Sequence, residues 1–163
     1  MTESNKILLE RREGPVLVLT MNRPKRHHAL NFALSESLAA AVTRAEKDKT
    51  VSVIVITGSG DTAFCAGQDM LEVSEAGEAA ADALPSAYIA LDKFSHTSVP
   101  IIAAINGYCF GGGAMLAIAC DIRLASTSAT FRLPGAEYGL VVGAAFLPRL
   151  IGASKAKELI YTA

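Results

Sequence analysis

Residues 101–121 read IIAAINGYCFGGGAMLAIACD, and this stretch decides the fold that we expect. It begins as a short apolar run, breaks at an Asn-Gly pair, and continues after the glycines 111–113 as a pattern of small and apolar residues that ends at Asp121. This order predicts a buried strand, a tight turn and a buried helix. The glycines should leave bare N–H groups at the helix N-terminus, where negative charge is favoured.

A similar unit lies earlier in the chain. Residues 51–57 form a short β-branched run that predicts a buried strand, and residues 63–69 read AFCAGQD, which predicts a second loop of small residues. The rhythm of strand, glycine loop and helix therefore occurs at 51–71 and again at 101–120. If the two loops converge, the amides of Gln68 and Gly112 would bind one oxygen and stabilise negative charge on it.

The other segments complete the expected outline. Leu34, Leu38, Val42 and Ala45 recur at helical spacing and predict an amphipathic helix. We expect a hairpin at 7–12 and 16–21, a basic loop at 22–28, a mobile segment at 72–82, a helix from about Ala83 to 95, strands at 122–126 and 130–133, a loop at 134–143, and helices at 144–151 and 154–161.

Composition points to one domain that spans residues 1–163. The chain is 51% hydrophobic and has a formal net charge of −1, which argues against a nucleic-acid or anionic-membrane partner. No uninterrupted apolar run or signal sequence is found, so we expect a soluble cytoplasmic protein. The odd number of cysteines, Cys65, Cys109 and Cys120, in apolar settings predicts buried reduced thiols.

Several common sites are excluded by spacing. The glycines do not form the dinucleotide-binding pattern, and no lysine follows them as in a phosphate-binding P-loop. The histidines lack metal-ligand spacing, so we expect no metal site, with His27, His28 and His96 solvated or capping. Asp69 and Asp121 are expected to be structural hydrogen-bond acceptors.

At these motifs the chain closely resembles the crotonase, or enoyl-CoA hydratase/isomerase, superfamily over essentially its whole length. The matching motifs are Asn22-Arg-Pro, Ala29-Leu-Asn31, the runs 53–58, 63–69 and 100–108, Gly111-Gly-Gly113, Cys120-Asp121 and Gly139-Leu140. The resemblance implies an α/β fold, a ClpP/crotonase-like spiral of ββα units, that usually assembles as a homo-trimer or hexamer.

The resemblance also implies a substrate and a site. Members of the superfamily bind acyl-CoA thioesters and hold the thioester oxygen with two backbone amides, so that an enolate can form. Gln68 and Gly112 match those amides. No cofactor is implied beyond the coenzyme A of the substrate. The remaining residues expected to contact the substrate are Lys25 and Arg26 at the CoA phosphates, Ala66 near the adenine, and Asp69, Met70, Met115 and Gly135.

The chain departs from the superfamily where proton transfer is expected. Typical hydratases carry two glutamates that handle the water, and these positions match Met115 and Gly135, neither of which moves a proton. A third acidic position used by some relatives matches Gly143. The nearest carboxylate is Glu137, a candidate acid or base. Alternatively, Gly135 marks an anion site, because dihydroxynaphthoyl-CoA synthase has glycine there and is thought to use bicarbonate.

The second departure is length, since the family normally continues well beyond this point. We therefore expect the C-terminal helical trimerisation region to be missing, either because the chain is a fragment or because a partner replaces that region. Its absence should expose an apolar patch that favours self-association. The members of this patch would be Leu147, Leu150, Ile151, Leu159 and Ile160.

The sequence thus predicts an acyl-CoA-processing enzyme of fatty acid metabolism, a lyase or isomerase of the enoyl-CoA hydratase/isomerase type. Two alternatives stay open. One is a catalytically silent homologue that binds CoA esters without turnover. The other is a family enzyme with different chemistry, such as decarboxylation, thioester hydrolysis or dehalogenation.

Overall fold

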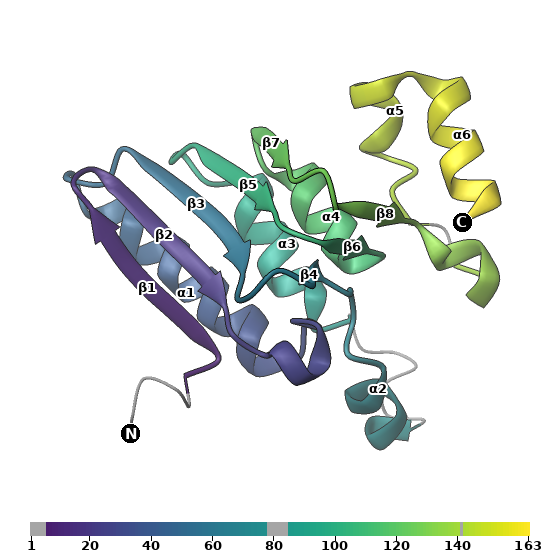
Figure 1. Ribbon diagram of the computed structural model, residues 1–163, viewed down its shortest axis with the longest axis horizontal. Coiled ribbons are helices and arrows are strands. Elements are labelled where there is room, and N and C mark those ends of the chain that lie inside the picture. Colours follow the sequence, from purple (N-terminus) through teal and green to yellow (C-terminus); the bar gives the residue numbers. More distant parts are fainter. Residues whose placement is uncertain (1–5, 78–84, 141) are drawn as a thin grey trace.

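Two sheets carry the fold in the computed structural model, which describes residues 6–77, 85–140 and 142–163 (Figure 1). The larger sheet has the order β1-β2-β3-β5-β7 and the smaller sheet the order β4-β6-β8. The larger sheet comprises β1 (Leu8–Glu13), β2 (Val16–Met21), β3 (Val53–Gly58), β5 (Ile101–Ile105) and β7 (Ile122–Ala125), and the smaller β4 (Ala63–Cys65), β6 (Tyr108–Phe110) and β8 (Thr130–Arg132).

The chain advances as a spiral, because each turn gives one strand to each sheet. Strands β3, β5 and β7 pair in parallel in the larger sheet, and the strands that follow them, β4, β6 and β8, pair in parallel in the smaller one. Only β1 and β2, the predicted hairpin, are antiparallel among the described strand pairs. The repeated rhythm in the sequence therefore corresponds to successive turns of the spiral.

The smaller sheet differs from the sequence expectation. The sequence predicts a loop over residues 63–69, but Ala63–Cys65 forms β4, and β6 follows directly on the predicted turn at 106–107. Each of these strands has three residues, too few for a periodic pattern to appear. The strands predicted at 122–126 and 130–133 are confirmed as β7 and β8.

Helices cover one face of the larger sheet (Figure 1). Helix α1 (Phe32–Lys47) is the predicted amphipathic helix, and it begins at Asn31, whose side chain accepts a hydrogen bond from the Leu34 amide. Helix α3 (Ala87–Ser95) packs between α1 and α4 (Gly112–Ala119). Alternate residues of β3 and β5, such as Ile54 and Ile101, are fully buried in the core beneath these helices.

The remaining segments refine the predicted boundaries. Part of the segment expected to be mobile forms helix α2 (Met70–Ala76), whereas residues 78–84, where the helix from about Ala83 was expected to begin, lie outside the described residues. The loop at 134–143 contains the short helix η4 (Pro134–Tyr138), and the basic loop contains η2 (Pro24–Arg26). The last two helices are α5 (Leu147–Ile151) and α6 (Ala153–Thr162).

The expected apolar patch on these last helices is only partly exposed. Leu150 and Ile151 are 48% and 42% exposed, but Leu147 and Ile160 are buried in the core. The prediction is wrong for the latter two because α5 and α6 pack on each other, and α6 also packs against η4.

The cysteines behave as predicted. Cys65, Cys109 and Cys120 are free thiols and all are buried. Burial raises the pKa of Cys65 and of Cys120 to about 12, and it raises the pKa of Cys109 further still. These thiols therefore act as small apolar core residues. Among the helices that the structure describes, none is long and apolar enough to cross a membrane.

The Asn106 side chain ties the ends of two neighbouring strands together. Its amide nitrogen donates to the carbonyl oxygens of Gly58 at 3.0 Å and Gly60 at 2.8 Å, and its oxygen accepts from the Gly58 amide at 3.2 Å. The next residue, Gly107, lies so close to the backbone that a Cβ atom there would be 2.2 Å from the Thr62 oxygen. The Asn-Gly pair therefore fixes where β5 ends and β6 begins.

We expect Asn106→Ala to lower the free energy of unfolding by about 2–3 kcal/mol, because several backbone groups lose their partner. Urea denaturation measures this loss. The matched control is Asn22→Ala, which removes one exposed hydrogen bond to the Lys6 oxygen and should cost about 1 kcal/mol or less. Equal losses in the two variants would contradict the role assigned to Asn106.

Candidate functional site

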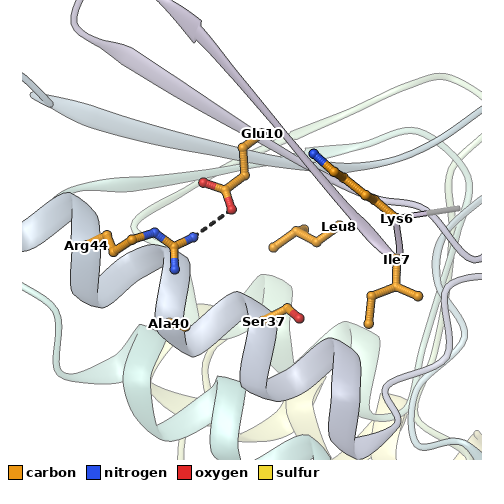
Figure 2. A pocket seen from close by; sticks show the side chains of 7 residues that line it. All are labelled: Lys6, Ile7, Leu8, Glu10, Ser37, Ala40 and Arg44. Atoms are coloured by element: carbon orange, nitrogen blue, oxygen red, sulfur yellow. Dashed lines mark hydrogen bonds and ion pairs between the residues drawn. The ribbon is translucent and has the colours of Figure 1, made fainter. Parts of the chain in front are cut away.

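Two hollows at the surface lie away from the two glycine loops. One, of about 380 Å³, opens between β1 and α1 and is lined by Lys6, Ile7, Leu8, Glu10, Ser37, Ala40 and Arg44 (Figure 2). An ion pair between Glu10 and Arg44, 2.6 Å long, spans it. A second, of about 290 Å³, adjoins it on the same side. Neither hollow is lined by a residue of the loops that follow β4 and β6. The candidate site is formed by those two loops, which carry the Gln68 and Gly112 amides.

The loops that carry Gln68 and Gly112 touch each other through their backbones. A Cβ atom at Gly67 would lie 2.9 Å from the Gly112 amide nitrogen, and one at Gly112 would lie 3.3 Å from the Gln68 amide nitrogen. Parallel pairing of β4 with β6, in which Cys65 lies opposite Cys109, brings the loops to this position. Glycine is required here because any side chain on Gly67 would separate the two amides.

Both amides are free donors while their neighbours are paired. Within residues 6–77, 85–140 and 142–163, neither the Gln68 nor the Gly112 amide donates a hydrogen bond. By contrast, the Gly111 amide donates to Arg132 at 2.9 Å, and the Asp69 amide donates to Leu30 at 3.0 Å. Two free donors side by side are suited to hold one oxygen of a ligand.

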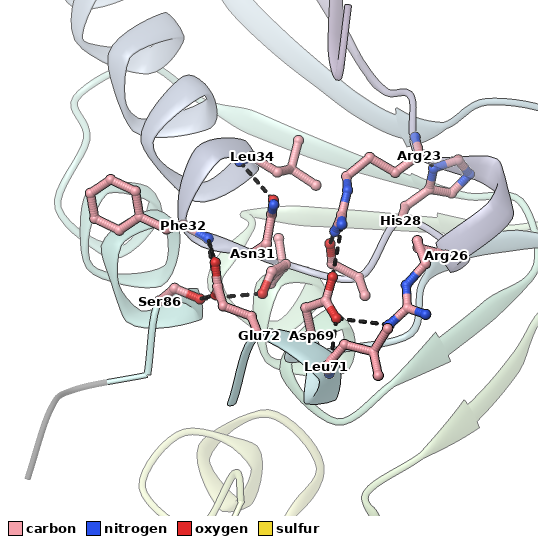
Figure 3. A network of polar contacts seen from close by, with 12 residues as sticks. Arg23, Arg26, His28, Asn31, Phe32, Leu34, Asp69, Leu71, Glu72 and Ser86 are labelled. Carbon is pink, nitrogen blue, oxygen red and sulfur yellow. Dashed lines mark hydrogen bonds and ion pairs between the residues drawn. The ribbon is translucent and has the colours of Figure 1, made fainter. Parts of the chain in front are cut away.

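Asp69 holds the first loop in place, as expected of a structural acceptor. Asp69 is only 3% exposed, and its carboxylate accepts hydrogen bonds from Arg23 at 2.8 Å, from Arg26 at 2.9 Å and from the Leu71 amide at the start of α2 (Figure 3). Burial alone would raise the pKa of this carboxyl, but the two guanidinium groups hold it below its usual range. Asp69 is therefore an ionised anchor, and the neighbouring Met70 is exposed.

His28 is buried, which contradicts the expectation of a solvated or capping histidine. The residue is 1% exposed. Its Nδ1 accepts a hydrogen bond from the Arg23 amide at 3.0 Å, and its Nε2 lies 3.1 Å from the Ser59 oxygen. Since a carbonyl only accepts, Nε2 carries the proton and the ring is neutral. Burial lowers the pKa of His28. The basic residues beside His28 lead to the expectation of a solvated loop. The sequence does not show that Arg23 and Ser59 bind the two ring nitrogens.

The residues expected at the CoA phosphates and adenine lie around the same loop. Lys25 and Arg26 are exposed on η2, and Arg26 is already paired with Asp69. Lys25 makes no ion pair with any residue that the structure describes. Ala66 is half-buried, and its amide donates to the His27 oxygen at 2.9 Å, so the basic loop and the Gln68 loop are joined.

The positions expected to match the glutamates of typical hydratases, Met115 and Gly135, carry no polar side chain. A Cβ atom at Gly135 would lie 2.6 Å from Val142 Cγ2 and 2.7 Å from the Leu140 oxygen, so Val142 fills the space where a carboxylate, or an anion in its place, would lie. Met115 Sδ would be 3.5 Å from a Cβ atom at Gly143. Neither position offers a proton-transfer group in this arrangement.

Glu137 lies in a surface ion pair. Its carboxylate is paired with Arg132, and both side chains are 46% exposed. Arg132 also donates from Nε to the Ala163 oxygen at 2.9 Å. No described contact joins Glu137 to the Gln68 or Gly112 loop. Elsewhere in the described residues, no group of three His, Cys, Asp or Glu side chains could hold a metal ion.

Comparison with known proteins gives consistent matches. A family model described as enoyl-CoA hydratase/isomerase matches residues 11–163. The chain is 37% identical to the short-chain-enoyl-CoA hydratase of Clostridium acetobutylicum, over 99% of this chain and 63% of that protein. It is 40% identical to the crotonyl-CoA hydratase of Syntrophomonas wolfei, over 96% of this chain and 62% of that protein.

Solved structures agree with these relatives. The crystal structure of enoyl-CoA hydratase from Bacillus anthracis has a TM-score of 0.91 at 33% identity, over 97% of this chain and 63% of that one. The predicted crotonase-like α/β fold is thereby confirmed. The chain spans less than two thirds of the length of these relatives.

We expect Gly67→Ala to destabilise the protein by at least about 3 kcal/mol. Two costs combine: alanine is strained at the φ of +102° found here, and its Cβ atom would collide with the Gly112 amide. Gly60→Ala is the matched control: its φ is also positive, at +75°, but nothing lies within 4 Å of the new Cβ, so about 1–2 kcal/mol is expected. Thermal or urea unfolding compares the two, and similar losses would refute the close backbone contact.

Protonation of His28 should destabilise the fold as pH falls. The pKa of His28 is lowered in the folded state. Below a pH of about 6.5 the unfolded chain therefore binds a proton that the folded chain excludes. The free energy of unfolding then falls with a slope of up to about 1.4 kcal/mol per pH unit. Unfolding free energies between about pH 7.5 and 5 measure this slope. His28→Gln should flatten it, whereas His96→Gln, at an exposed site, should not. An unchanged slope in His28→Gln would remove His28 as its cause.

Proposed function

The chain belongs to the enoyl-CoA hydratase/isomerase family, and we propose that it binds acyl-CoA thioesters and stabilises a thioester enolate between the amides of Gln68 and Gly112. The observation that carries this proposal is the pair of free, adjacent amides at the ends of β4 and β6. The family acts on acyl-CoA thioesters, and the relatives named above are hydratases of enoyl-CoA and crotonyl-CoA. Membership of this family therefore suggests that the oxygen held by the two amides is the carbonyl oxygen of the thioester.

The geometry suits charge that develops during reaction. Removing a proton next to a thioester carbonyl moves negative charge onto the carbonyl oxygen. Two preoriented N–H donors stabilise that oxygen more in the transition state than in the ground state, and one such donor is typically worth about 3 kcal/mol. In the proposed complex, Lys25 and Arg26 contact the CoA phosphates, and the loop at Ala66 contacts the adenine.

Proton transfer is the open step of this proposal. Met115 and Gly135 carry no acid or base, so hydration by the usual pair of glutamates is not proposed. Glu137 stays a candidate, although reaching a substrate would require it to leave Arg132. The lack of an acid or base at Met115 and Gly135 also favours a second function. A protein that binds CoA esters without turnover needs the two amides but no proton-transfer group.

Assembly and location complete the proposal. We propose the homo-trimer or hexamer typical of the family, acting in the cytoplasm. Exposed apolar side chains on β7, Ile122 and Leu124, together with Leu150 and Ile151, supply surface that association would bury.

Binding can be tested with a chromophoric thioester, para-dimethylaminocinnamoyl-CoA, whose absorption moves to longer wavelength when its carbonyl is polarised. We expect saturable binding with a red shift. Gly112→Ala should reduce the shift, because its methyl group lies 3.3 Å from the Gln68 amide, in the space of the bound oxygen. Gly60→Ala, away from the loops, should keep it. Absence of binding, or an unaltered shift in Gly112→Ala, would overturn the proposed site.

Turnover separates the two functions. The chain is incubated with crotonyl-CoA and with a β,γ-unsaturated acyl-CoA ester, and absorbance of the conjugated thioester is followed. Conversion of either ester supports the enzyme, and its loss in Glu137→Gln but not in Glu158→Gln would assign proton transfer to Glu137. Glu158 is a fair control because it is also an exposed, ion-paired glutamate. Binding without conversion supports the binding protein.

A further inference from the structure

We propose that the side chains of Gln68, Ser86 and Glu72 form a positioning network that holds the Gln68 amide in the orientation needed to bind the thioester oxygen. The inference rests on the proposed function, because it assigns a role within the same site. It concerns side chains that do not touch the reacting atoms and act through the Gln68 backbone.

The network is continuous from the loop to two helices. Gln68 Nε2 donates to Ser86 Oγ at 2.8 Å, and Gln68 Oε1 accepts from the Ala87 amide at 3.1 Å, at the start of α3. Ser86 Oγ donates in turn to Glu72 Oε2 at 2.7 Å (Figure 3). The Glu72 carboxylate accepts from the Phe32 amide at 2.9 and 3.1 Å, at the start of α1.

The helix ends make this network costly to disturb. The first amides of a helix have no acceptor within the helix, and Phe32 and Ala87 are the first residues of α1 and α3. Ser86, at the N-cap of α3, makes no capping hydrogen bond with its own side chain. Gln68 and Glu72 supply the acceptors instead. Both helices contribute buried residues to the core, so the network anchors the loop to helices that are packed in the core.

The anchor acts on the peptide unit that carries the free donor. The carbonyl of that unit, Gly67 O, accepts from the Leu30 amide at 2.7 Å, which fixes one side of the peptide plane. Gly67 itself has a φ of +102° and no side chain to restrict it. The Gln68 side chain fixes the other side of the unit, next to the donor. Both anchors are needed because a donor contributes fully only within about half an ångström of its ideal position.

The test uses the red shift of bound para-dimethylaminocinnamoyl-CoA at saturation. The band position of the bound ester does not depend on how much protein is folded, so a loss of stability alone does not move it. Gln68→Ala keeps the backbone amide but removes its tether, and we expect it to lose roughly half of the red shift. Ser86→Ala, which leaves Gln68 in place, should lose a smaller part. Ser86→Thr, which keeps the hydroxyl, should restore it.

The control is Ser37→Ala, which removes an exposed hydroxyl bonded to the Ala33 oxygen within α1 and should leave the shift unchanged. If the unmodified chain binds the ester with a red shift but Gln68→Ala and Ser86→Ala retain all of it, the positioning network is overturned while the proposed function stands. If the unmodified chain gives no bound band, the proposed function fails and this inference fails with it. Should Gln68→Ala not fold, Ser86→Ala and Ser86→Thr decide the question.

Discussion

The structure depends on the contact between two backbone segments, at Gly67 and Gly112, where the strands of the smaller sheet end. Strand pairing sets the distance between these segments, and glycine removes the side chains that would keep them apart. The larger sheet and its helices bury most of the core. The sheet acts on the site indirectly, because it fixes the ends of β3 and β5, from which β4 and β6 start, whereas the start of α3 contacts the Gln68 side chain directly.

Charged side chains near the site hold the Gln68 loop in place. Asp69, with Arg23 and Arg26, joins the basic loop to the loop of Gln68, and Ala66 joins the same two segments through a backbone hydrogen bond. A buried carboxylate with two guanidinium partners is stable only when all its hydrogen bonds are made, so the three residues act as a unit. The arginine expected at the CoA phosphates is thus partly committed to holding the fold.

Much of the fold could be predicted from the sequence because its longer elements have clear periodic patterns. Helix α1, the β1–β2 hairpin, β3 and β5 follow from such patterns, and the free amides of Gln68 and Gly112 lie in the glycine loops that the sequence indicates. The short strands β4 and β6 could not be predicted. Burial of His28 depends on contacts with a distant segment at Ser59, which no local pattern records. The filling of the space beside Gly135 by Val142 depends on how the loop between them turns, which the sequence pattern does not specify.

The two donors at the centre of the site are main-chain amides, and this has a consequence for how the protein responds to its surroundings. An amide N–H does not ionise in the range where proteins are folded, so the ionisation state of the two donors is constant with pH. Any pH optimum of a reaction there would report the proton-transfer group or the folding equilibrium, in which His28 takes part. Similarly, reagents that modify side chains would leave both donors intact, and only a proline could remove either one.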